Sequence, residues 1–406
     1  MDFVVNRERL EQTATVPAAP LTLGEGDILV RIEQFAFTAN NVSYAATGDA
    51  LGYWKFFPTS TTDSNSNGRV PVWGVGTIVA SRCSGLSSSS SQTSRKVYGY
   101  FPMSHYVMLH PAAITTSSFV DGMPHRRSLP AVYNQYLLCD EDPFYAPRTE
   151  RAMMVLRPLF FTSWLLLDFF SNQDFFGATA CILSSASSKT SIGLAFLLQQ
   201  YNQRQKDKTS KKIQIIGLTS PRNQAFVQAL GVYDQIILYD TLEQDLTKNQ
   251  PSCFVDMAGN TQLTTRLHQH LRDNMKYSCL VGAAHVGQGG KPTQKLPGAR
   301  PKFFFAPSWT ARRIQELDAS KRRGMEILLH HVLLDYQRFV QWCLVEPQPW
   351  LKVKLYCGPT QVKEGYQACL QGNIPPDTAV IMSLWEEAAA AEQKQNPTAA
   401  NTRSKL

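Results

Sequence analysis

The sequence predicts an α/β protein with two domains, one a partly open β-barrel and the other a doubly wound parallel sheet. Between residues 180 and 283, short apolar strand patterns alternate with helical patterns, as in consecutive βαβ units. Between residues 24 and 111, several short strand patterns are separated by Gly and Pro turns, which is typical of a barrel. A chain of 406 residues, 43% hydrophobic and 18% charged, is long enough for two domains.

The parallel sheet is predicted from five strand patterns whose ends carry small residues. They read ACIL at 180–183, IQIIGLTS at 213–220, QIILYD at 235–240, CFVDMAG at 253–259 and YSCLVGAA at 277–284. In open α/β sheets a dinucleotide lies at the carboxyl ends of the strands, where the backbone must be approachable. The pattern therefore predicts a nucleotide cofactor and, with it, an enzyme.

The other elements follow from periodicity and turn residues. Strands are predicted within 1–20, 26–39, 70–81 and 96–111, the last as two short strands around Pro102. Glycines inside 70–81 indicate a bend or a close backbone approach. Residues 111–150 show no clear period. A helix is predicted from Arg151, then a long helix in two pieces near Gly324, and finally a strand, a helix and a strand.

These elements define the predicted domains. Residues 1–160 and 319–384 form the barrel domain, residues 161–318 form the nucleotide-binding domain, and residues 385–406 form a flexible tail. The tail ends in Ser404-Lys405-Leu406, which matches a peroxisomal address. We therefore expect the peroxisomal import receptor as a partner and the peroxisome as the location, with the cytoplasm otherwise.

Composition argues against several classes of function. The formal charge is +8, but the basic residues are scattered rather than gathered with aromatic residues, so nucleic acid is not an expected partner. The positive charge suits an anionic cofactor. Eight cysteines without a CxxC pair indicate free thiols in a reducing compartment. The apolar run at 159–170 is too short for a membrane span and carries Asp168.

The order of these motifs resembles the medium-chain dehydrogenase/reductase superfamily, on its zinc-free, quinone-oxidoreductase-like side. The most similar segment is IIGLTSPRNQAFVQALGVYDQIILYD, because relatives read a strand, a Thr-Ser turn, a helix ending Leu-Gly-Ala and a strand ending in Tyr. GPTQVKEGYQACLQGNIPPDTAVIM resembles the closing helix and strand of the family. YAATGDALGYWKFFP, SSASSKTSIGLA and FFFAP look like a poorly characterised branch known as a domain of unknown function.

The resemblance implies a GroES-like barrel domain, a Rossmann domain, bound NADP(H), and a small-molecule carbonyl, enone or quinone substrate. Relatives are often dimers or tetramers, so the resemblance is compatible with a homodimer, and the sequence alone does not decide the oligomeric state. The resemblance gives cofactor-binding roles to Thr162 in the helix before the sheet, to Tyr239 at the third strand end, and to Gly259 and Gly282 at the fourth and fifth.

The phosphate loop departs from the family pattern AAxGxVG, because only the last glycine, Gly193, is kept. Backbone N–H groups at the start of the following helix would still attract phosphate, and the Ser and Thr hydroxyls would add donors. The alternative is that the loss of glycines closes the cleft and leaves a relic. The candidate phosphate-binding residues are Ser185, Ser187, Ser188, Lys189, Thr190, Ser191 and Gly193.

The turn after the second strand indicates which dinucleotide is preferred. An acidic residue there would bind the ribose 2′-hydroxyl of NAD. The turn instead reads Thr219, Ser220, Pro221 and Arg222, with one guanidinium and no acid. Arg222 and Ser220 could bind a 2′-phosphate, so we expect NADP(H) rather than NAD(H).

No catalytic zinc is expected, because the loop at 37–41 lacks the Cys of zinc-dependent relatives, and His268 and His270 are too close in sequence for one helix face. Hydride transfer would then depend on hydrogen-bond donors at a substrate carbonyl. The candidates are Asn40 or Asn41, one of which matches a family Asn, and Tyr44 and Tyr53. Trp54, Phe56 and Phe57 would form an apolar wall, unless they are barrel core.

Together these features predict a zinc-independent, NADPH-dependent reductase of an activated C=C bond or a quinone. The alternative is a catalytically degenerate relative that acts as a ligand-binding or scaffold protein, which the glycine-poor phosphate loop favours. A third interpretation, a reductase of long enoyl thioesters, rests on the peroxisomal address and the aromatic residues.

Overall fold

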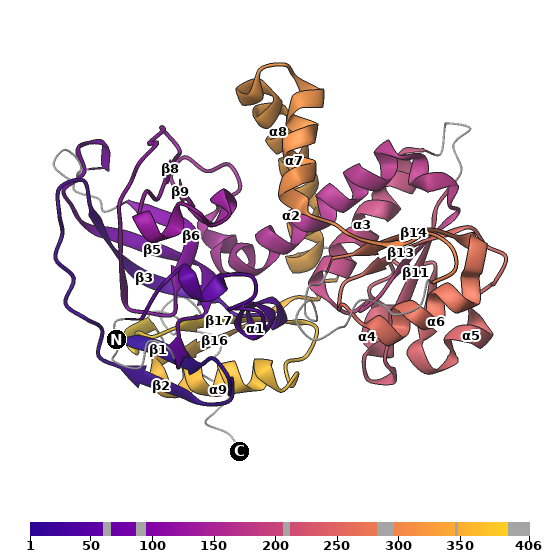
Figure 1. Cartoon of the computed structure of the whole chain (residues 1–406), viewed down its shortest axis with the longest axis horizontal. Coiled ribbons are helices and arrows are strands. Elements are labelled where there is room, and N and C mark those ends of the chain that lie inside the picture. Colours follow the sequence, from indigo (N-terminus) through magenta and orange to yellow (C-terminus); the bar gives the residue numbers. More distant parts are fainter. Residues whose placement is uncertain (60–65, 87–94, 206–211, 282–295, 346–347, 389–406) are drawn as a thin grey trace. The chain divides into compact units, whose positions relative to one another are not determined.

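The computed structural model describes residues 1–59, 66–86, 95–205, 212–281, 296–345 and 348–388 (Figure 1). The chain forms two compact units: unit 1 comprises Met1–Val155 and Lys352–Leu406, and unit 2 comprises Leu156–Leu351. The second boundary lies at residue 351 rather than at 318. The reason is that the long helices before it pack with unit 2, as described below.

Unit 1 is built around an eight-stranded sheet to which both ends of the chain contribute strands. The strand order is β16-β17-β3-β5-β6-β9-β8, and β7 pairs with β3. The strands are β3 Ile28–Ala36, β5 Pro71–Ser81, β6 Lys96–Pro102, β7 Tyr106–Leu109, β8 Ser118–Val120, β9 Gln135–Leu138, β16 Lys352–Cys357 and β17 Thr378–Ser383.

Smaller elements complete unit 1. A second sheet has the order β2-β1-β4 and consists of β1 Asp2–Asn6, β2 Thr13–Val16 and β4 Asn67–Gly68. The helices are α1 Ala39–Ala46 and α9 Gly358–Leu370, and short 3-10 turns include η1 Tyr53–Lys55, η4 Pro124–Arg126 and η5 Ala131–Tyr133. Apolar side chains from both ends of the chain share one core, among them Phe3, Phe37 and Tyr366.

Glycines allow two central strands of unit 1 to approach each other closely. A Cβ on Gly74 would lie 2.7 Å from the Gln34 carbonyl oxygen, and a Cβ on Gly76 would lie 2.7 Å from that of Arg31. A side chain at position 74 or 76 would therefore push β3 away from β5. This confirms the close approach that the glycines of 70–81 predicted.

Unit 2 contains a six-stranded parallel sheet with the order β12-β11-β10-β13-β14-β15. Counted along the chain this order is 3-2-1-4-5-6, the doubly wound arrangement of dinucleotide-binding domains. The strands are β10 Ala180–Leu183, β11 Gln214–Thr219, β12 Gln235–Leu238, β13 Ser252–Asp256, β14 Met275–Leu280 and β15 Pro301–Phe303. The five predicted strands are all present.

Helices cover both faces of this sheet, and Figure 1 shows α3 and α6 on opposite sides of it. Leu263, Leu267 and Leu271 of α6 pack into the sheet's apolar core. Phe339 of α8 stacks on Phe160 of α2 and meets the ring of Phe196 of α3 edge-on, so these three helices are joined. The helices are α2 Glu150–Asn172, α3 Lys189–Arg204, α4 Gln224–Ala229, α5 Leu242–Asp245, α6 Thr261–Leu271, α7 Ala306–Leu317 and α8 Lys321–Leu344.

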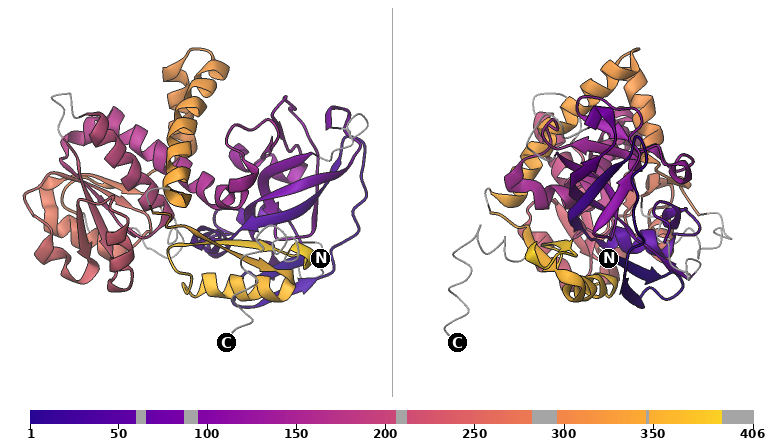
Figure 2. Two further views of the ribbon diagram at one scale, coloured as in Figure 1. Left: turned by 180° about the vertical axis from the view of Figure 1, so that it is seen from behind. Right: turned by 90° about the vertical axis from the view of Figure 1, so that its left-hand side faces the viewer.

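The last two helices of unit 2 form a hairpin, and they lie side by side in both views of Figure 2. The predicted break near Gly324 lies instead at residues 318–320, so Gly324 is inside α8. A Cβ on Gly324 would lie 2.1 Å from the Ile314 carbonyl oxygen of α7. Gly324 therefore provides close helix packing rather than a helix end.

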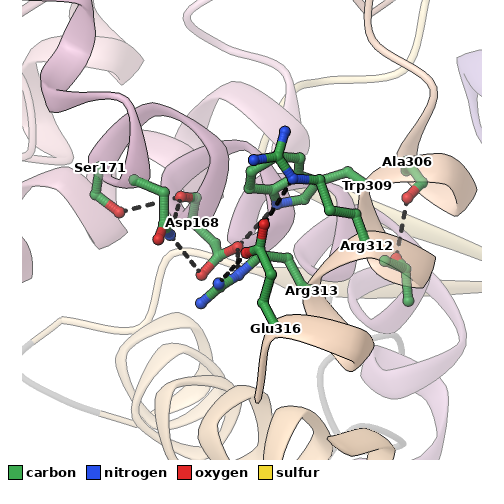
Figure 3. Close-up of polar contacts among 9 residues, drawn as sticks. Asp168, Ser171, Ala306, Trp309, Arg312, Arg313 and Glu316 are labelled. Atoms are coloured by element: carbon green, nitrogen blue, oxygen red, sulfur yellow. Dashed lines mark hydrogen bonds and ion pairs between the residues drawn. The ribbon is translucent and has the colours of Figure 1, made fainter. Parts of the chain in front are cut away.

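Asp168 anchors this hairpin to α2 (Figure 3). Its Oδ2 accepts a 2.8 Å hydrogen bond from Trp309 Nε1 and a 2.7 Å bond from Arg313 Nε. The side chains of Asp168 and Arg313 are 11% and 15% exposed, so this pair is largely removed from water. Arg313 also pairs with Glu316 one turn later. The Asp168 carboxylate, which is the charged group in the apolar run of α2, is thus hydrogen-bonded and paired within unit 2.

By length and composition alone, residues 147–172 could cross a membrane, because their most apolar window has a mean hydropathy of 1.5. That helix is longer than the apolar run seen in the sequence. However, 61% of the window is buried inside the fold. Such burial is the pattern of a core helix in a folded domain.

Candidate cofactor and substrate sites

The carboxyl ends of β10 and β13 are tied together through side chains. Ser184, at the end of β10, is fully buried, and its Oγ donates a 2.9 Å hydrogen bond to Asp256 Oδ1. The same Oγ accepts a hydrogen bond from the N–H of Met257 at 2.8 Å. Asp256 Oδ1 also accepts the N–H groups of Ala258 and Gly259, both at 3.1 Å. A buried carboxylate therefore shapes the edge at which a dinucleotide is expected.

The first turn of the phosphate loop is tight although it contains no glycine. Ser185 has a φ of +51°, a left-handed conformation that glycine adopts most easily. Its N–H donates a 2.9 Å hydrogen bond to the Tyr239 hydroxyl, and its carbonyl accepts the N–H of Ser188 at 2.7 Å. Burial raises the pKa of Tyr239, so this hydroxyl stays protonated. Tyr239 thus holds the loop at the position where relatives use small residues.

The serines at the start of α3 close the helix end. Ser188 is the N-cap, and its Oγ accepts the Ser191 N–H at 3.2 Å. Ser191 Oγ, which is buried, donates to the Ser184 carbonyl at 2.7 Å. These two hydroxyls therefore act within the loop. Ser187, Lys189 and Thr190 are half-buried beside them.

The small size of Gly193 lets α3 pack closely on α2. A Cβ there would lie 2.8 Å from Ser163 Oγ, which itself donates to the Thr190 carbonyl at 2.8 Å. In dinucleotide-binding folds the last glycine of the loop allows close packing of the helix on a strand, whereas the contact at Gly193 is between two helices. Thr162 lies next to Ser163, and its hydroxyl donates to the Pro158 carbonyl of its own helix at 3.2 Å.

The end of β11 carries a buried side-chain hydroxyl, that of Thr219. Thr219 is 1% exposed, and its Oγ1 has no hydrogen-bond partner among the described residues. Ser220 follows as the cap of a 3-10 turn that contains the exposed Arg222. Asn223, at the end of that turn, donates from Nδ2 to Ser187 Oγ at 3.0 Å. The second strand end and the phosphate loop are therefore joined, as one binding edge requires.

These observations fit a dinucleotide at this edge. A buried hydroxyl without a partner normally needs an explanation, and a bound polar ligand is one. The half-buried phosphate loop at the start of a helix supplies backbone donors for phosphate. Gly259, with a φ of +69°, turns the chain after β13. Gly282 lies outside the described residues.

Four tyrosines from different elements of unit 1 gather their hydroxyl groups in one place. We call Tyr44, Tyr53, Tyr100 and Tyr133 the tyrosine cluster; they come from α1, η1, β6 and η5 respectively. The ring centroids of Tyr44 and Tyr53 are 4.3 Å apart, and those of Tyr100 and Tyr133 are 4.6 Å apart. Burial and the neighbouring hydroxyls raise the pKa of all four, so each is a neutral donor at pH 7.

The hydrogen bonds of the cluster are unequal. Tyr44 accepts a 2.6 Å bond from Asn40 Nδ2. The hydroxyls of Tyr53 and Tyr133 are 3.5 Å apart, at the outer limit for a hydrogen bond. Tyr100 is fully buried, and its hydroxyl has no hydrogen-bond partner among the described residues. The Tyr133 hydroxyl also interacts with that of Tyr44. Tyr100 is therefore the member of the cluster whose hydroxyl is left without a partner among the described residues.

The two adjacent asparagines have different positions. Asn40 is exposed at the start of α1, whereas Asn41 is buried. The Asn41 side chain accepts from the N–H and hydroxyl of Thr38 and donates to the Pro71 carbonyl at 3.0 Å. Asn41 thus holds the start of α1, and Asn40 is the one of the pair that reaches the tyrosine cluster.

The three aromatic residues after Tyr53 belong to the core. Trp54, Phe56 and Phe57 are each less than 5% exposed and pack in the apolar cluster of unit 1. The wall that was expected from them is therefore the inner layer of the barrel. Phe56 supports the tyrosine cluster directly, since its centroid is 5.3 Å from those of Tyr100 and Tyr133.

A buried arginine lies under the tyrosine cluster. Arg126 is 1% exposed; its Nη1 pairs with Asp121 at 2.9 Å, and its Nη2 donates to the Tyr133 carbonyl at 2.7 Å. The guanidinium also lies over the Phe57 ring at 4.8 Å. Its positive charge opposes the rise in the pKa of Tyr100 that burial causes. Arg126 thus fixes the backbone that carries Tyr133.

Within the described residues, no group of three or more His, Cys, Asp or Glu side chains could hold a metal ion. His268 lies between the Pro297 carbonyl and the Ser278 hydroxyl, and burial lowers its pKa. His270 contacts the Leu246 carbonyl at 2.7 Å. Both histidines of α6 are therefore engaged inside unit 2.

The sequence indicated Tyr44 and Tyr53 but not their partners. A signal for Tyr100 was available: in KVYGYFP, Tyr98 and Tyr100 lie two residues apart and share one face of β6. Trp73 of β5 pairs with Tyr100 across the sheet. Tyr133 falls in the stretch without periodicity, so its place in the cluster depends on tertiary structure alone.

The family described as Protein of unknown function (DUF2855) matches residues 35–375. The chain belongs to the DUF2855 family. The matched range includes the tyrosine cluster, the phosphate loop and the whole sheet of unit 2. No curated protein matches this DUF2855 chain in sequence.

Solved structures with a similar fold include an oxidoreductase and an NADPH:quinone reductase. CurA from Vibrio vulnificus in complex with NADPH is 10% identical, with a TM-score of 0.52 over 94% of this chain and 98% of that one. The yhdH oxidoreductase from Salmonella enterica with NADP is 10% identical, with a TM-score of 0.50 over 94% and 99%. A candidate NADPH:quinone reductase from Mesorhizobium loti is 13% identical, with a TM-score of 0.52 over 89% and 88%.

These similarities establish the fold of this DUF2855 protein. It combines a GroES-like unit with a Rossmann unit, as in medium-chain dehydrogenases/reductases. The predicted fold class is therefore confirmed. The identities are too low to carry over the chemistry of any one relative, so function depends on the sites described above.

Proposed function

We propose that this protein is an NADPH-dependent, zinc-independent reductase of an activated C=C bond or a quinone. The observation that carries the proposal is the edge of the unit 2 sheet. There, the phosphate loop and the basic turn at Arg222 occur together with the Thr219 hydroxyl, which has no hydrogen-bond partner in the part of the chain that the structure describes. Structural neighbours crystallised with NADPH or NADP support the choice of cofactor.

Particular residues of unit 2 would hold the cofactor. The N–H groups at the start of α3 would receive the pyrophosphate, with Ser187 and Thr190 beside them. Thr219 and Ser220 would bind the adenosine ribose, and Arg222 would bind the 2′-phosphate. When bound, NADPH would supply a hydride for the β-carbon of an enone or for a quinone.

The residues of unit 1 would act on the substrate oxygen. Hydride addition moves an electron pair onto the carbonyl oxygen, and hydrogen-bond donors there stabilise the resulting enolate. Tyr53, half-buried at the rim of the tyrosine cluster, would donate to that oxygen. Asn40 would orient the Tyr44 hydroxyl through their 2.6 Å hydrogen bond.

The cofactor part of the proposal is tested by titration. The purified protein is titrated with NADPH and with NADH, following nicotinamide fluorescence, beside an Arg222→Glu variant. Wild-type protein is expected to bind NADPH more tightly. The variant is expected to lose about 10- to 100-fold in NADPH affinity, because a charge-assisted contact to phosphate is replaced by repulsion.

NADH is the matched control, since it lacks the 2′-phosphate, and its affinity is expected to change less than threefold in the variant. Equal loss for both nucleotides would mean that Arg222 acts on the fold rather than on the phosphate. If neither nucleotide binds wild-type protein, the glycine-poor loop is a relic. The protein would then be a ligand-binding or scaffold protein instead of a reductase.

The cellular part of the proposal rests on sequence alone. Ser404-Lys405-Leu406 lies outside the described residues. We propose that the peroxisomal import receptor reads this address and delivers the protein to the peroxisome. Removal of Leu406 from a fluorescent fusion is expected to leave the protein in the cytoplasm.

A further inference from the structure

The tyrosine cluster contains a buried hydroxyl group whose hydrogen-bonding capacity is not used within the described residues. Tyr100 has no partner among the described residues, and Tyr53 and Tyr133 share one contact of 3.5 Å. A hydroxyl buried without a partner costs about 1–3 kcal/mol, and native proteins leave few such groups. A phenylalanine at position 100 would carry no hydroxyl and so would avoid that cost.

The surroundings of these hydroxyls are flat and aromatic. Trp73 pairs with Tyr100 across the sheet at 5.1 Å, and it stacks on Tyr98 at 5.6 Å with an interplanar angle of 14°. Trp73, Tyr53 and Tyr133 are each partly buried, so they form the rim, while Tyr44 and Tyr100 form the floor. A ligand that suits this setting is planar and carries an acceptor at one edge.

We propose that the tyrosine cluster binds the carbonyl oxygen of a planar conjugated ligand, a quinone or an aryl enone, whose ring stacks on Trp73. In the complex, the Tyr53 and Tyr133 hydroxyls turn from each other to the ligand oxygen, and Tyr100 is the deepest donor. This inference rests on the proposed function for its chemistry and narrows the substrate class. Long aliphatic enoyl thioesters, which offer no ring to Trp73, are excluded as preferred ligands.

The arrangement also provides a proton. In that complex, a hydride from NADPH, which would be oxidised to NADP+, would form a new C–H bond at the β-carbon of the ligand. The π pair of the Cα=Cβ bond would shift to the bond between the α-carbon and the carbonyl carbon, and the carbonyl π pair would move to oxygen, giving an enolate. The Tyr53 O–H bond would then break, and its proton would form an O–H bond on that oxygen or a C–H bond at the α-carbon as the carbonyl re-forms. The phenolate left on Tyr53 recovers a proton from water at the rim. Arg126 donates a 2.7 Å hydrogen bond to the Tyr133 carbonyl, and this bond keeps Tyr133 in position during the reaction.

The test compares stability and binding in a Tyr100→Phe variant of the full-length protein. The probe is 2,3-dimethyl-1,4-naphthoquinone, and its binding is followed by quenching of intrinsic fluorescence without cofactor. Removal of an unpartnered hydroxyl is expected to leave the melting temperature unchanged or raise it. The same change is expected to weaken binding about five- to tenfold, as loss of one neutral hydrogen bond does.

Two further variants test the stacking surface and provide a control outside the tyrosine cluster. Trp73→Leu is expected to weaken binding at least tenfold by removing the stacking surface. Tyr366→Phe is the matched control, since its buried hydroxyl donates to the Leu10 carbonyl at 2.9 Å away from the cluster. It is expected to lower stability and leave probe affinity within twofold of wild type.

Two outcomes would overturn the inference. One is a Tyr100→Phe protein that is less stable but binds the probe normally, because the hydroxyl would then serve the fold through a buried water. The other is tighter binding of trans-2-decenoyl-CoA than of the naphthoquinone. The readout needs no NADPH, so failure of the proposed reductase activity is distinguishable from failure of this site. Probe binding that Tyr100→Phe weakens supports the site even if no nucleotide binds.

Discussion

At the scale of single residues, the arginine beneath the tyrosine cluster has the largest structural consequence. Arg126 and Asp121 form an ion pair in which both side chains are almost completely buried. The remaining donors of Arg126 are used by Asn134, the Tyr136 hydroxyl and the Tyr133 carbonyl. Such a pair contributes little net stability when complete but is costly to break, because the remaining charge stays buried.

An Arg126→Met variant is therefore expected to lose about 3–5 kcal/mol of unfolding free energy in unit 1. Urea unfolding followed by near-UV circular dichroism, which reports the packed aromatic rings, measures the loss. The double variant Arg126→Met, Asp121→Leu is expected to recover part of it, since no unpaired carboxylate is left. A single variant that loses less than 1 kcal/mol would show that water reaches Asp121.

At the same scale, the phosphate loop shows what a local sequence signal conveys. Ser188 and Gly193 were predicted as phosphate-binding residues from the sequence of the loop, and the structure adds that Ser188 is the N-cap of α3 and that Gly193 lets α3 pack on α2. The structural role of Asp256 could not be predicted from the sequence. Its carboxylate accepts four hydrogen bonds, and these donors come together only in the folded chain. Asn40 and Asn41 could not be separated, because their difference is burial.

At the scale of elements, strands were predicted better than helix ends. The five strands of the parallel sheet have strong apolar patterns, and all are present. β8 and β9 were not predicted, because they are only three and four residues long and lie among prolines. The break between α7 and α8 was predicted near Gly324 because glycine often ends helices. In the structure Gly324 lies inside α8, where its lack of a side chain lets α8 pack closely on α7.

The α7–α8 hairpin gives a test of that packing. Alanine is about 1 kcal/mol better than glycine inside a helix. Even so, Gly324→Ala is expected to destabilise unit 2 by about 1–3 kcal/mol, because the new Cβ would lie 2.1 Å from the Ile314 carbonyl oxygen. Thermal unfolding measures the change. Arg322→Ala, on the exposed first turn of α8, is the control, with an expected change below about 0.5 kcal/mol. A stabilised Gly324→Ala protein would contradict the packing role.

At the scale of the whole molecule, the two units have separate apolar cores. One core draws on both ends of the chain, and the other lies within residues 180–275. A ligand that binds one unit therefore stabilises that unit first. At a hundredfold excess over its dissociation constant, a ligand adds about 2.7 kcal/mol.

Saturation with NADPH is accordingly expected to slow hydrogen exchange of the most protected amides in β10, β11 and β13 about a hundredfold. Amides of β3, β5 and β6 are expected to exchange at unchanged rates. Mass spectrometry of peptides from both units measures this directly. Equal slowing in both units would mean that they open as one cooperative body.

The pairing of β3 with β17 also governs the order of events during synthesis. Ile381 pairs with Ala36, so 345 further residues must be made before the unit 1 sheet can close. At roughly 5–20 residues per second, that wait lasts roughly 17–70 s. The segment for unit 2 emerges as one uninterrupted piece within that interval. A nascent chain is thus expected to complete unit 2 on the ribosome before the sheet of unit 1 can close.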